Sequence, residues 1–264
     1  MKIIVTGHKG FIGSNLKKEL EKKYEVVGIG LDDLPDLQTL LNSNKPGAIF
    51  HVGACSDTLN QDVDWMMEVN WAATVLISNY CNQANIPLIY SSTAAIYGDP
   101  LGFRNLYAWS KYAAEQHVIA NKQIALRYFN VYGPGEEHKG KMASIAYQSF
   151  QKKENGEEVK LFPLNPRRDF VYVKDVVDAN LFALKNYFKL EKKYYDVGVG
   201  KEESFEYVMD IMEIPYTYTE TSSIPKNYQF HTVSNKDLWM KGWKPKYDLE
   251  KGLKEYKEYL CKSI

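Results

Sequence analysis

The sequence is poor in cysteine. Only three occur, Cys55, Cys81 and Cys261, and their odd number and irregular spacing exclude a disulfide framework or a cysteine-ligated metal centre. We therefore expect a reducing compartment, the cytoplasm, and no metal site. The chain begins with MKIIVTG, which leads directly into a strand pattern, so the sequence predicts no signal peptide.

The chain also has no excess of charge and no long apolar run. Its 33 basic residues balance 33 acidic ones, which argues against an electrostatic interaction with nucleic acid. No apolar stretch approaches the roughly 18 residues that a membrane-spanning helix needs. We expect neither nucleic acid nor membrane as a partner, and local groups would have to bind a negatively charged small substrate.

Short apolar runs alternate with amphipathic patterns in the first half of the chain. We expect strands at 2–7, 25–30, 48–54, 87–93 and 124–131, and helices at 11–23, 36–44, 62–85 and 106–121. Buried strands that alternate with helices predict an α/β fold built on a doubly wound parallel sheet of the Rossmann type.

Beyond residue 130 the alternation is less regular. We expect a helix near 142–153, a strand pair within 159–173, a helix at 174–188, a strand at 194–200, and short helices with loops over 204–264. Residues 1–128 plus about 169–200 are predicted to form the sheet domain. Residues of about 129–168 plus 201–264 are predicted to form a smaller α/β lobe over the carboxyl edge of the sheet, where ligands bind in such folds.

The stretch TGHKGFIG lies between the first expected strand and the first expected helix. Gly7 permits a tight turn, Gly10 lets the backbone approach a pyrophosphate, and Gly13 allows close helix–strand packing. The helix start at Phe11 and Ile12 presents N–H groups to the anion. This context predicts a bound dinucleotide, NAD or NADP.

The residue that usually distinguishes these two cofactors is missing. A carboxylate at the end of the second strand binds the adenosine ribose and disfavours a 2′-phosphate, but Gly30 occupies this position. Asp32 follows, and the chain then enters the next helix, so the second and third strand regions are compressed into one. His8 and Lys9 could meet a 2′-phosphate or could simply form a solvated turn.

The stretch YAWSK places Tyr107 and Lys111 four residues apart in a helical pattern, so both face the same side. An ammonium beside a phenol is expected to lower the phenol pKa from about 10. Thr93 ends the preceding strand, where its hydroxyl can hydrogen-bond a reacting oxygen. We interpret the three residues as a site at which Tyr107 takes a proton from a sugar hydroxyl while a hydride leaves for a nicotinamide ring.

These motifs and their order resemble the extended short-chain dehydrogenases/reductases, and among them the NAD(P)-dependent nucleotide-sugar epimerase/dehydratase family. RYFNVYGP (127–134) and RDFVYVKDV (168–176) are shared across that family, whereas GACSDT (53–58) and HKGKMAS (138–144) are most similar to its heptose 6-epimerase branch. The resemblance implies an NAD or NADP that is tightly bound and not consumed. It implies that the residues around the cofactor, besides the glycine turn, Tyr107 and Lys111, are Asp32, Gly53, Ala54 and Val131.

The resemblance also implies a nucleotide-diphosphate sugar as substrate. Arg168 matches an arginine that binds the diphosphate, and a guanidinium suits phosphate oxygens. Besides Thr93, the positions that match substrate contacts are Asn130, Lys139, Lys141, Gln148, Phe162, Arg168 and Tyr228. Lys139 matches a second catalytic base on the opposite face of the sugar, which a 6-epimerase needs and a 4-epimerase does not. Lys141 replaces a small hydroxyl residue of that branch.

Two departures leave the substrate open. The loop from Tyr97 to Tyr107 and the region after the second strand are shorter than in the heptose branch. Ala94 and Ala95 replace the acidic pair of the dehydratases, which argues against a 4,6-dehydratase. The alternatives are a UDP-sugar 4-epimerase, a nucleotide-sugar 4-reductase or dehydrogenase, and a non-catalytic cofactor sensor.

Two further expectations concern packing. The helices at 62–85 and 106–121 could pair with a second subunit as a four-helix bundle, which is the usual dimer of the family, or could be ordinary core. His51 lies inside a buried strand pattern and is predicted to be a core histidine rather than a catalyst.

Overall fold

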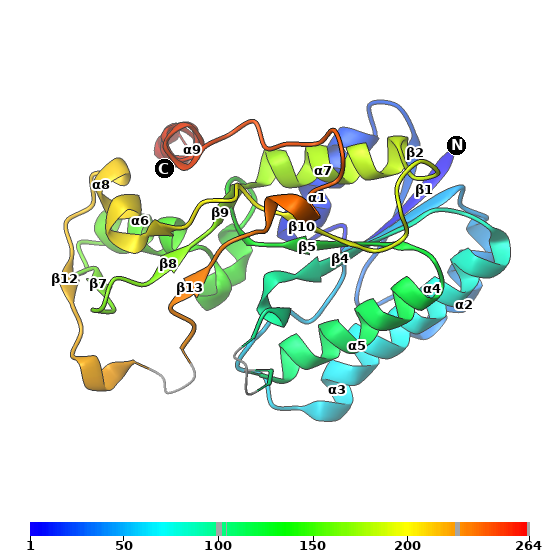
Figure 1. Cartoon of the computed structure of the whole chain (residues 1–264), viewed down its shortest axis with the longest axis horizontal. Coiled ribbons are helices and arrows are strands. Elements are labelled where there is room, and N and C mark those ends of the chain that lie inside the picture. The colour runs from blue at the N-terminus through cyan, green and yellow to red at the C-terminus, as the bar shows by residue number, and fades with distance from the viewer. Residues whose placement is uncertain (99–101, 104, 225–227, 263–264) are drawn as a thin grey trace.

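The computed structural model describes residues 1–98, 102–103, 105–224 and 228–262. Its centre is a six-stranded sheet in which every neighbouring pair is parallel (Figure 1). In spatial order the strands are β10 (Tyr194–Val197), β5 (Ile124–Tyr128), β4 (Leu88–Thr93), β3 (Ala48–His51), β1 (Lys2–Thr6) and β2 (Glu25–Ile29). The predicted doubly wound fold is confirmed.

The strand order reverses between β1 and β3. From β1 the chain moves outward to β2, and then returns across β1 to β3 and continues in the other direction. Doubly wound sheets bind ligands at the carboxyl ends of the strands beside this reversal. In the described part of the sheet no strand lies outside β2, because η1 (Leu34–Asp36) and α2 (Leu37–Asn44) lead directly into β3. The predicted compression of this region is confirmed.

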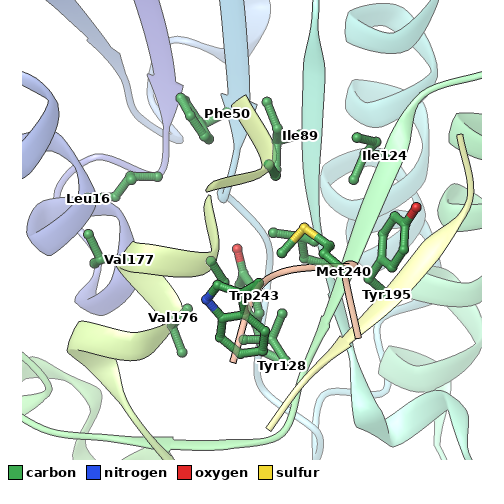
Figure 2. Close-up of a cluster of buried hydrophobic side chains, with 14 of the residues drawn as sticks. Leu16, Phe50, Ile89, Ile124, Tyr128, Val176, Val177, Tyr195, Met240 and Trp243 are labelled. Carbon is green, nitrogen blue, oxygen red and sulfur yellow. The ribbon is translucent and has the colours of Figure 1, made fainter. Parts of the chain in front are cut away.

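Helices cover both faces of the sheet. Leu16 of α1 (Phe11–Leu20) and Val177 of α7 (Val173–Lys185) share a buried cluster with Phe50 and Ile89 (Figure 2). On the other face, α2, α4 (Ala73–Ala84) and α5 (Leu106–Ala120) pack on the strands through a second cluster, which includes Leu41, Ile77, Val118, Ile49 and Leu88. In the described residues, no helix combines the length and the apolar character needed to cross a membrane.

The predicted helix 62–85 is interrupted. It begins as α3 (Val63–Met67), widens into a π-helical segment, η2 (Glu68–Ala72), and continues as α4. A π segment adds a residue to a turn and is frequent at functional sites. Here it turns the buried Asn70 toward the carboxyl end of β3.

The predicted strand 124–131 is split as well. β5 ends at Tyr128, and β6 (Asn130–Tyr132) leaves the main sheet to pair in parallel with β9 (Phe170–Tyr172). The expected strand pair within 159–173 is wrong as a pair, because its members bond to distant segments. β7 (Lys160–Leu161) pairs with β12 (Thr217–Tyr218), and β8 (Arg167–Arg168) pairs with β11 (Glu203–Ser204) and β13 (His231–Thr232).

The remaining elements pack around a third apolar cluster. Helices α6 (Ile145–Glu154), α8 (Phe205–Met212) and α9 (Leu249–Lys262) contribute Phe150, Met209 and Tyr256 to it, and α1 contributes Phe11. Short 3₁₀ turns complete the chain at η3 (Ala94–Ile96), η4 (Glu137–Met142), η5 (Thr221–Ser223) and η6 (Lys236–Leu238). Because Phe11 follows the glycine turn directly, this cluster links the α6–α8–α9 region to the sheet.

Candidate active site

The glycine turn after β1 packs against the end of β3. A Cβ on Gly7, which has φ +66°, would lie 2.6 Å from the Gly53 Cα, and a Cβ on Gly13 would lie 2.1 Å from the Gly7 carbonyl oxygen. These contacts leave no room for any side chain. The three predicted positions Gly7, Gly13 and Gly53 therefore form one tightly packed cradle at the strand-order reversal.

The first turn of α1 opens from this cradle. Gly10 is its N-cap in an extended conformation, and among the described residues no side chain caps the N–H groups there. Uncapped N–H groups at a helix start attract anions such as a pyrophosphate. The cradle and the helix start thus fit the diphosphate of a dinucleotide, with Gly10, Phe11 and Ile12 nearest to it.

The carboxylate that hydrogen-bonds the end of β2 is that of Asp33, and the cofactor contact predicted for Asp32 stays a prediction. The Gly30 N–H donates to Asp33 Oδ2 at 2.6 Å, whereas Asp32 is exposed. The His8 ring packs on Gly28, where a Cβ would lie 2.3 Å from the His8 Cγ. The sequence analysis did not single out Asp33. Its spacing of three residues from Gly30 could have indicated the contact, because an Asp side chain at such a distance can turn back to a backbone N–H.

Thr93, Tyr107 and Lys111 come together at the carboxyl end of β4. The Asn105 side chain caps α5 by accepting from the Ala108 N–H at 2.8 Å, and this places Tyr107 in the first helical turn. The Thr93 side chain, whose hydroxyl accepts from the Ala95 N–H at 3.1 Å, is close enough to Tyr107 to lower the pKa of its phenol. Lys111 follows one turn later, is only 2 % exposed, and holds its Nζ 4.2 Å from the Tyr90 ring centroid.

The expected lowering of the Tyr107 pKa by Lys111 is wrong for this structure. Burial raises the pKa of Tyr107, the hydrogen bond with Thr93 opposes this, and the nearby Cys55 thiol raises it again. Burial also lowers the pKa of Lys111 to about 7, against a raising effect of Glu115. The physical reason is shared, since desolvation disfavours both the phenolate and the ammonium.

Asn70 is a residue that the sequence analysis missed. Its amide donates to the Cys55 carbonyl and to the Ser110 hydroxyl, each at 3.0 Å, and its oxygen accepts from the Cys55 N–H at 2.8 Å. The π segment thereby ties the loop after β3 to the helix that carries Tyr107. A buried Asn within an apolar helical run was the only signal in the sequence.

Lys139 lies on η4, beside the glycine turn. Its Nζ is 5.3 Å from the ring centroid of Phe11, and burial lowers the Lys139 pKa while Glu136 raises it. Lys141 is exposed. At the far end of η4, Met142 Sδ lies 4.0 Å from the Thr58 hydroxyl, so this loop meets the GACSDT loop after β3. The structure therefore groups Lys139, but not Lys141, with the dinucleotide cradle.

The predicted substrate residues divide into two groups. Phe162 and Tyr228 meet edge to face at 5.0 Å, and the Arg168 guanidinium lies 5.2 Å from the Tyr228 ring. By contrast, Arg167 pairs with Glu202 and Glu203. Arg168 and the aromatic pair thus form one group.

Four further predicted positions lie elsewhere, Asn130 and Gln148 for the substrate and Val131 and Ala54 for the cofactor. Asn130 is exposed, with its side chain 3.4 Å from the Thr232 hydroxyl, and Val131 is half-buried behind it. The Gln148 amide donates to the carbonyls of Ala143 and Lys141, at 2.7 and 3.3 Å. Gln148 therefore stabilises the Lys139 loop, by which we mean residues 133–144. Ala54, half-buried, continues from Gly53.

His51 is a core residue, as predicted. Its ring nitrogens contact the hydroxyls of Thr6 and Thr74 at 2.7 and 2.9 Å, and burial lowers its pKa to about 3. The Thr6 hydroxyl also accepts from the Gly53 N–H at 3.0 Å. The neutral imidazole therefore fixes Thr6, whose hydroxyl in turn bonds the cradle at Gly53.

Comparison with known proteins agrees with this geometry. The model of the NAD dependent epimerase/dehydratase family matches residues 3–198. The chain is 34% identical to ADP-L-glycero-D-manno-heptose-6-epimerase of Brachyspira hyodysenteriae over 320 aligned residues, which cover 99% of this chain and 98% of that protein. The alignment is longer than the chain because the relative has segments that this chain lacks.

Solved structures show the same likeness. Helicobacter pylori ADP-L-glycero-D-manno-heptose-6-epimerase superposes with a TM-score of 0.84 at 28% identity, over 98% of this chain and 96% of that one. Thermus thermophilus UDP-glucose 4-epimerase, solved in complex with NAD, superposes with a TM-score of 0.85 at 24% identity over the full length of both chains. The chain belongs to the NAD dependent epimerase/dehydratase family.

Proposed function

We propose that this chain is an NAD(P)-dependent nucleotide-sugar epimerase, similar to the heptose 6-epimerases, that oxidises a sugar carbon transiently and reduces it again. The observation that carries the proposal is the grouping of Thr93, at the carboxyl end of β4, with Tyr107 and the buried Lys111, one helical turn apart on α5, at the same sheet edge as the dinucleotide cradle. The full-length similarity to a heptose 6-epimerase supports the same conclusion.

Each residue has a distinct part in this proposal. A nicotinamide bound beside Tyr107 and Lys111 would supply the hydride acceptor and later the hydride donor. Tyr107, in its phenolate form, would take the proton of the sugar hydroxyl as its carbon loses the hydride, and would give the proton back on reduction. Thr93 orients that oxygen. Lys111, buried one helical turn from Tyr107, would bind the ribose next to the nicotinamide, and burial lowers its pKa to about 7.

Lys139 is proposed as the second acid–base group, which protonates and deprotonates the oxygen when the other face of the carbon is presented. Its half-buried position beside Phe11 and its lowered pKa favour this role. A UDP-sugar 4-epimerase would need Tyr107 alone, so loss of Lys139 separates the two kinds of epimerase. A net reductase or dehydrogenase would exchange free cofactor during turnover.

Around this chemistry we propose a two-lobed subunit. Residues 1–128 with about 169–200 would bind the cofactor, and about 129–168 with 201–264 would bind the nucleotide-diphosphate part of the substrate through Arg168, Phe162 and Tyr228. The return of β10 to the main sheet after the excursion through β7 and β8 supports these boundaries. We also propose a cytoplasmic homodimer.

Two measurements test the function. The purified protein is denatured, and the released cofactor and any sugar nucleotide are identified by mass, which separates NAD from NADP. Epimerisation of ADP-, GDP-, UDP- and dTDP-sugars is then followed for the wild type, Tyr107→Phe and Tyr112→Phe. We expect Tyr107→Phe to lower kcat at least about a hundredfold, because general acid–base catalysis contributes that much. Tyr112→Phe removes a hydroxyl but keeps the ring, whose centroid lies 5.0 Å from that of Phe103, and should behave as wild type. An active Tyr107→Phe enzyme would exclude the proposal.

A further inference from the structure

A carboxylate is buried directly behind the Lys139 loop. Glu136 has 0% of its surface exposed, whereas its neighbours Glu137 and His138 are exposed. Among the described residues, no ion pair involves Glu136. Its partners are hydrogen-bond donors: the Gly133 N–H at 3.1 Å, the Ser144 N–H at 2.5 Å and the Ser144 hydroxyl at 2.7 Å. A buried charge is costly unless it is fully hydrogen-bonded, so this arrangement calls for a reason.

The partners of Glu136 lie at the two ends of one loop. Gly133 follows β6, and Ser144 is the N-cap of α6, where its hydroxyl accepts from the Tyr147 N–H at 3.2 Å. One side chain thus joins the entrance and the exit of the segment that carries Lys139. The Glu136 carbonyl also accepts from the Lys139 N–H at 3.0 Å, so the first turn of η4 starts from the same residue.

A carboxylate suits this position better than an amide does. Both of its oxygens accept, and it has no N–H that would need a partner inside the protein. The Gln148 amide, in contrast, donates hydrogen bonds to the carbonyls of Lys141 and Ala143, to which an ionised carboxylate could not donate. The loop therefore has an acceptor for its N–H groups and a donor for its carbonyls.

Lys139 lies at the centre of this closed loop. Its ammonium nitrogen is 5.3 Å from the ring centroid of Phe11, the first residue of α1, and the negative charge of Glu136 is near enough to favour its charged form against burial. The start of the loop is fixed on the same helix, because the Asn15 amide donates to the Pro134 carbonyl at 2.8 Å. The position of the lysine amine thus depends on contacts that meet at Glu136.

We propose that Glu136 is a positioning residue for catalysis: by joining Gly133 to Ser144 it holds Lys139 at the dinucleotide turn as the second acid–base group. This inference rests on the proposed epimerase function. It assigns to Glu136 an action through Lys139, beyond support of the fold.

A double-mutant cycle tests the inference. Glu136→Gln, Lys139→Ala and the double variant are compared with the wild type, and Glu137→Gln serves as the control for an acid in the same loop that is exposed. We expect Glu136→Gln to lower kcat at least about tenfold with KM nearly unchanged, since misplacement of an acid–base group affects the chemical step. We expect it to have no further effect in the Lys139→Ala background, because coupled residues are not additive. Glu136→Asp, which keeps the charge, should retain more activity than Glu136→Gln.

A second readout does not depend on activity. Trypsin cleavage after Lys139 and Lys141, followed by mass spectrometry of the cofactor-loaded protein, should be several-fold faster in Glu136→Gln and unchanged in Glu137→Gln. An unchanged kcat in Glu136→Gln, or an equal loss in both Lys139 backgrounds, would overturn the inference. If the wild type epimerises no nucleotide sugar, the proposed function fails instead. In that case an unchanged cleavage rate in Glu136→Gln would separately refute the claim that Glu136 fixes the loop. Should Glu136→Gln not fold, Glu136→Asp carries the same comparison.

Discussion

At the residue scale, the most unusual group is the buried amine of Lys111. The side chain is 2% exposed and burial lowers its pKa to about 7, whereas an unfolded chain would keep it near 10.5. Between these two values the unfolded state binds more protons than the folded state. Stability from this group is therefore greatest above about pH 10 and is lost as the pH falls toward 7.

This leads to a prediction for Lys111→Met, which replaces the amine with an apolar side chain of similar length. The variant should be inactive but more stable than the wild type at pH 7. The difference in the free energy of unfolding should shrink by about 1.4 kcal/mol per pH unit between pH 7 and about 10. Urea unfolding of both proteins at pH 6.5, 7.5, 8.5 and 9.5 measures it. A difference that does not change with pH would show that the Lys111 pKa is not lowered.

The sequence singled out some candidate site residues and not others, and their functions remain predictions. Tyr107, Lys111 and the three glycines stand at fixed spacings in one helix or one turn, so local geometry alone defines them. Asn70 and Glu136 act through contacts with segments that are distant in the sequence or through a loop closure, for example Asn70 with Ser110. No local spacing encodes such contacts. Asp33, whose carboxylate accepts from the Gly30 N–H, was not singled out because this contact depends on the short turn after β2.

At the scale of elements, long periodic segments were predictable and short ones were not. The strands of the main sheet were found because each is a buried apolar run between helices. Strands of two residues, such as β8 with β11 and β13, form where the tertiary structure brings backbones together. The break in the 62–85 helix depends on the buried hydrogen bonds of Asn70, which helical periodicity does not reveal.

The docking of the Lys139 loop on α1 gives an element-scale prediction. Gly135 has φ +98°, and a Cβ there would lie 2.9 Å from the Asn15 amide nitrogen, whereas Gly140 and Gly156 also have positive φ but have nothing within 4 Å. All three alanine variants incur the cost of a strained backbone, about 1 kcal/mol. Only Gly135→Ala should also displace the loop, with a further loss of thermal stability and a several-fold loss of kcat. Differential scanning calorimetry and epimerase assays compare Gly135→Ala with Gly156→Ala, and equal effects in both would contradict the docking.

At the scale of the whole molecule, one face of the sheet carries exposed aromatic residues. Trp65 of α3, Trp71 of η2 and Trp109 of α5 are 36%, 39% and 44% exposed, and the three elements lie together below the sheet (Figure 1). Leu59 and Val63, at 70% and 55%, adjoin them in the chain. Tryptophan is enriched at protein interfaces, and grouped apolar side chains on a surface mark interaction sites. This tryptophan face lies on the helices expected to pair with a second copy.

The tryptophan face therefore predicts the assembly. If a second copy covers it, Trp65→Glu will place a charge in an apolar interface and shift the protein toward monomers, since a buried unpaired charge costs several kcal/mol. Phe188→Glu is the matched control, because Phe188 is 80% exposed and follows α7 on the opposite face of the sheet. Sedimentation velocity over a range of concentrations should show a dimer for the wild type and for Phe188→Glu, and dissociation for Trp65→Glu. A monomeric wild type would mean that these tryptophans serve another partner, and a dimeric Trp65→Glu would place the dimer contact elsewhere on the molecule.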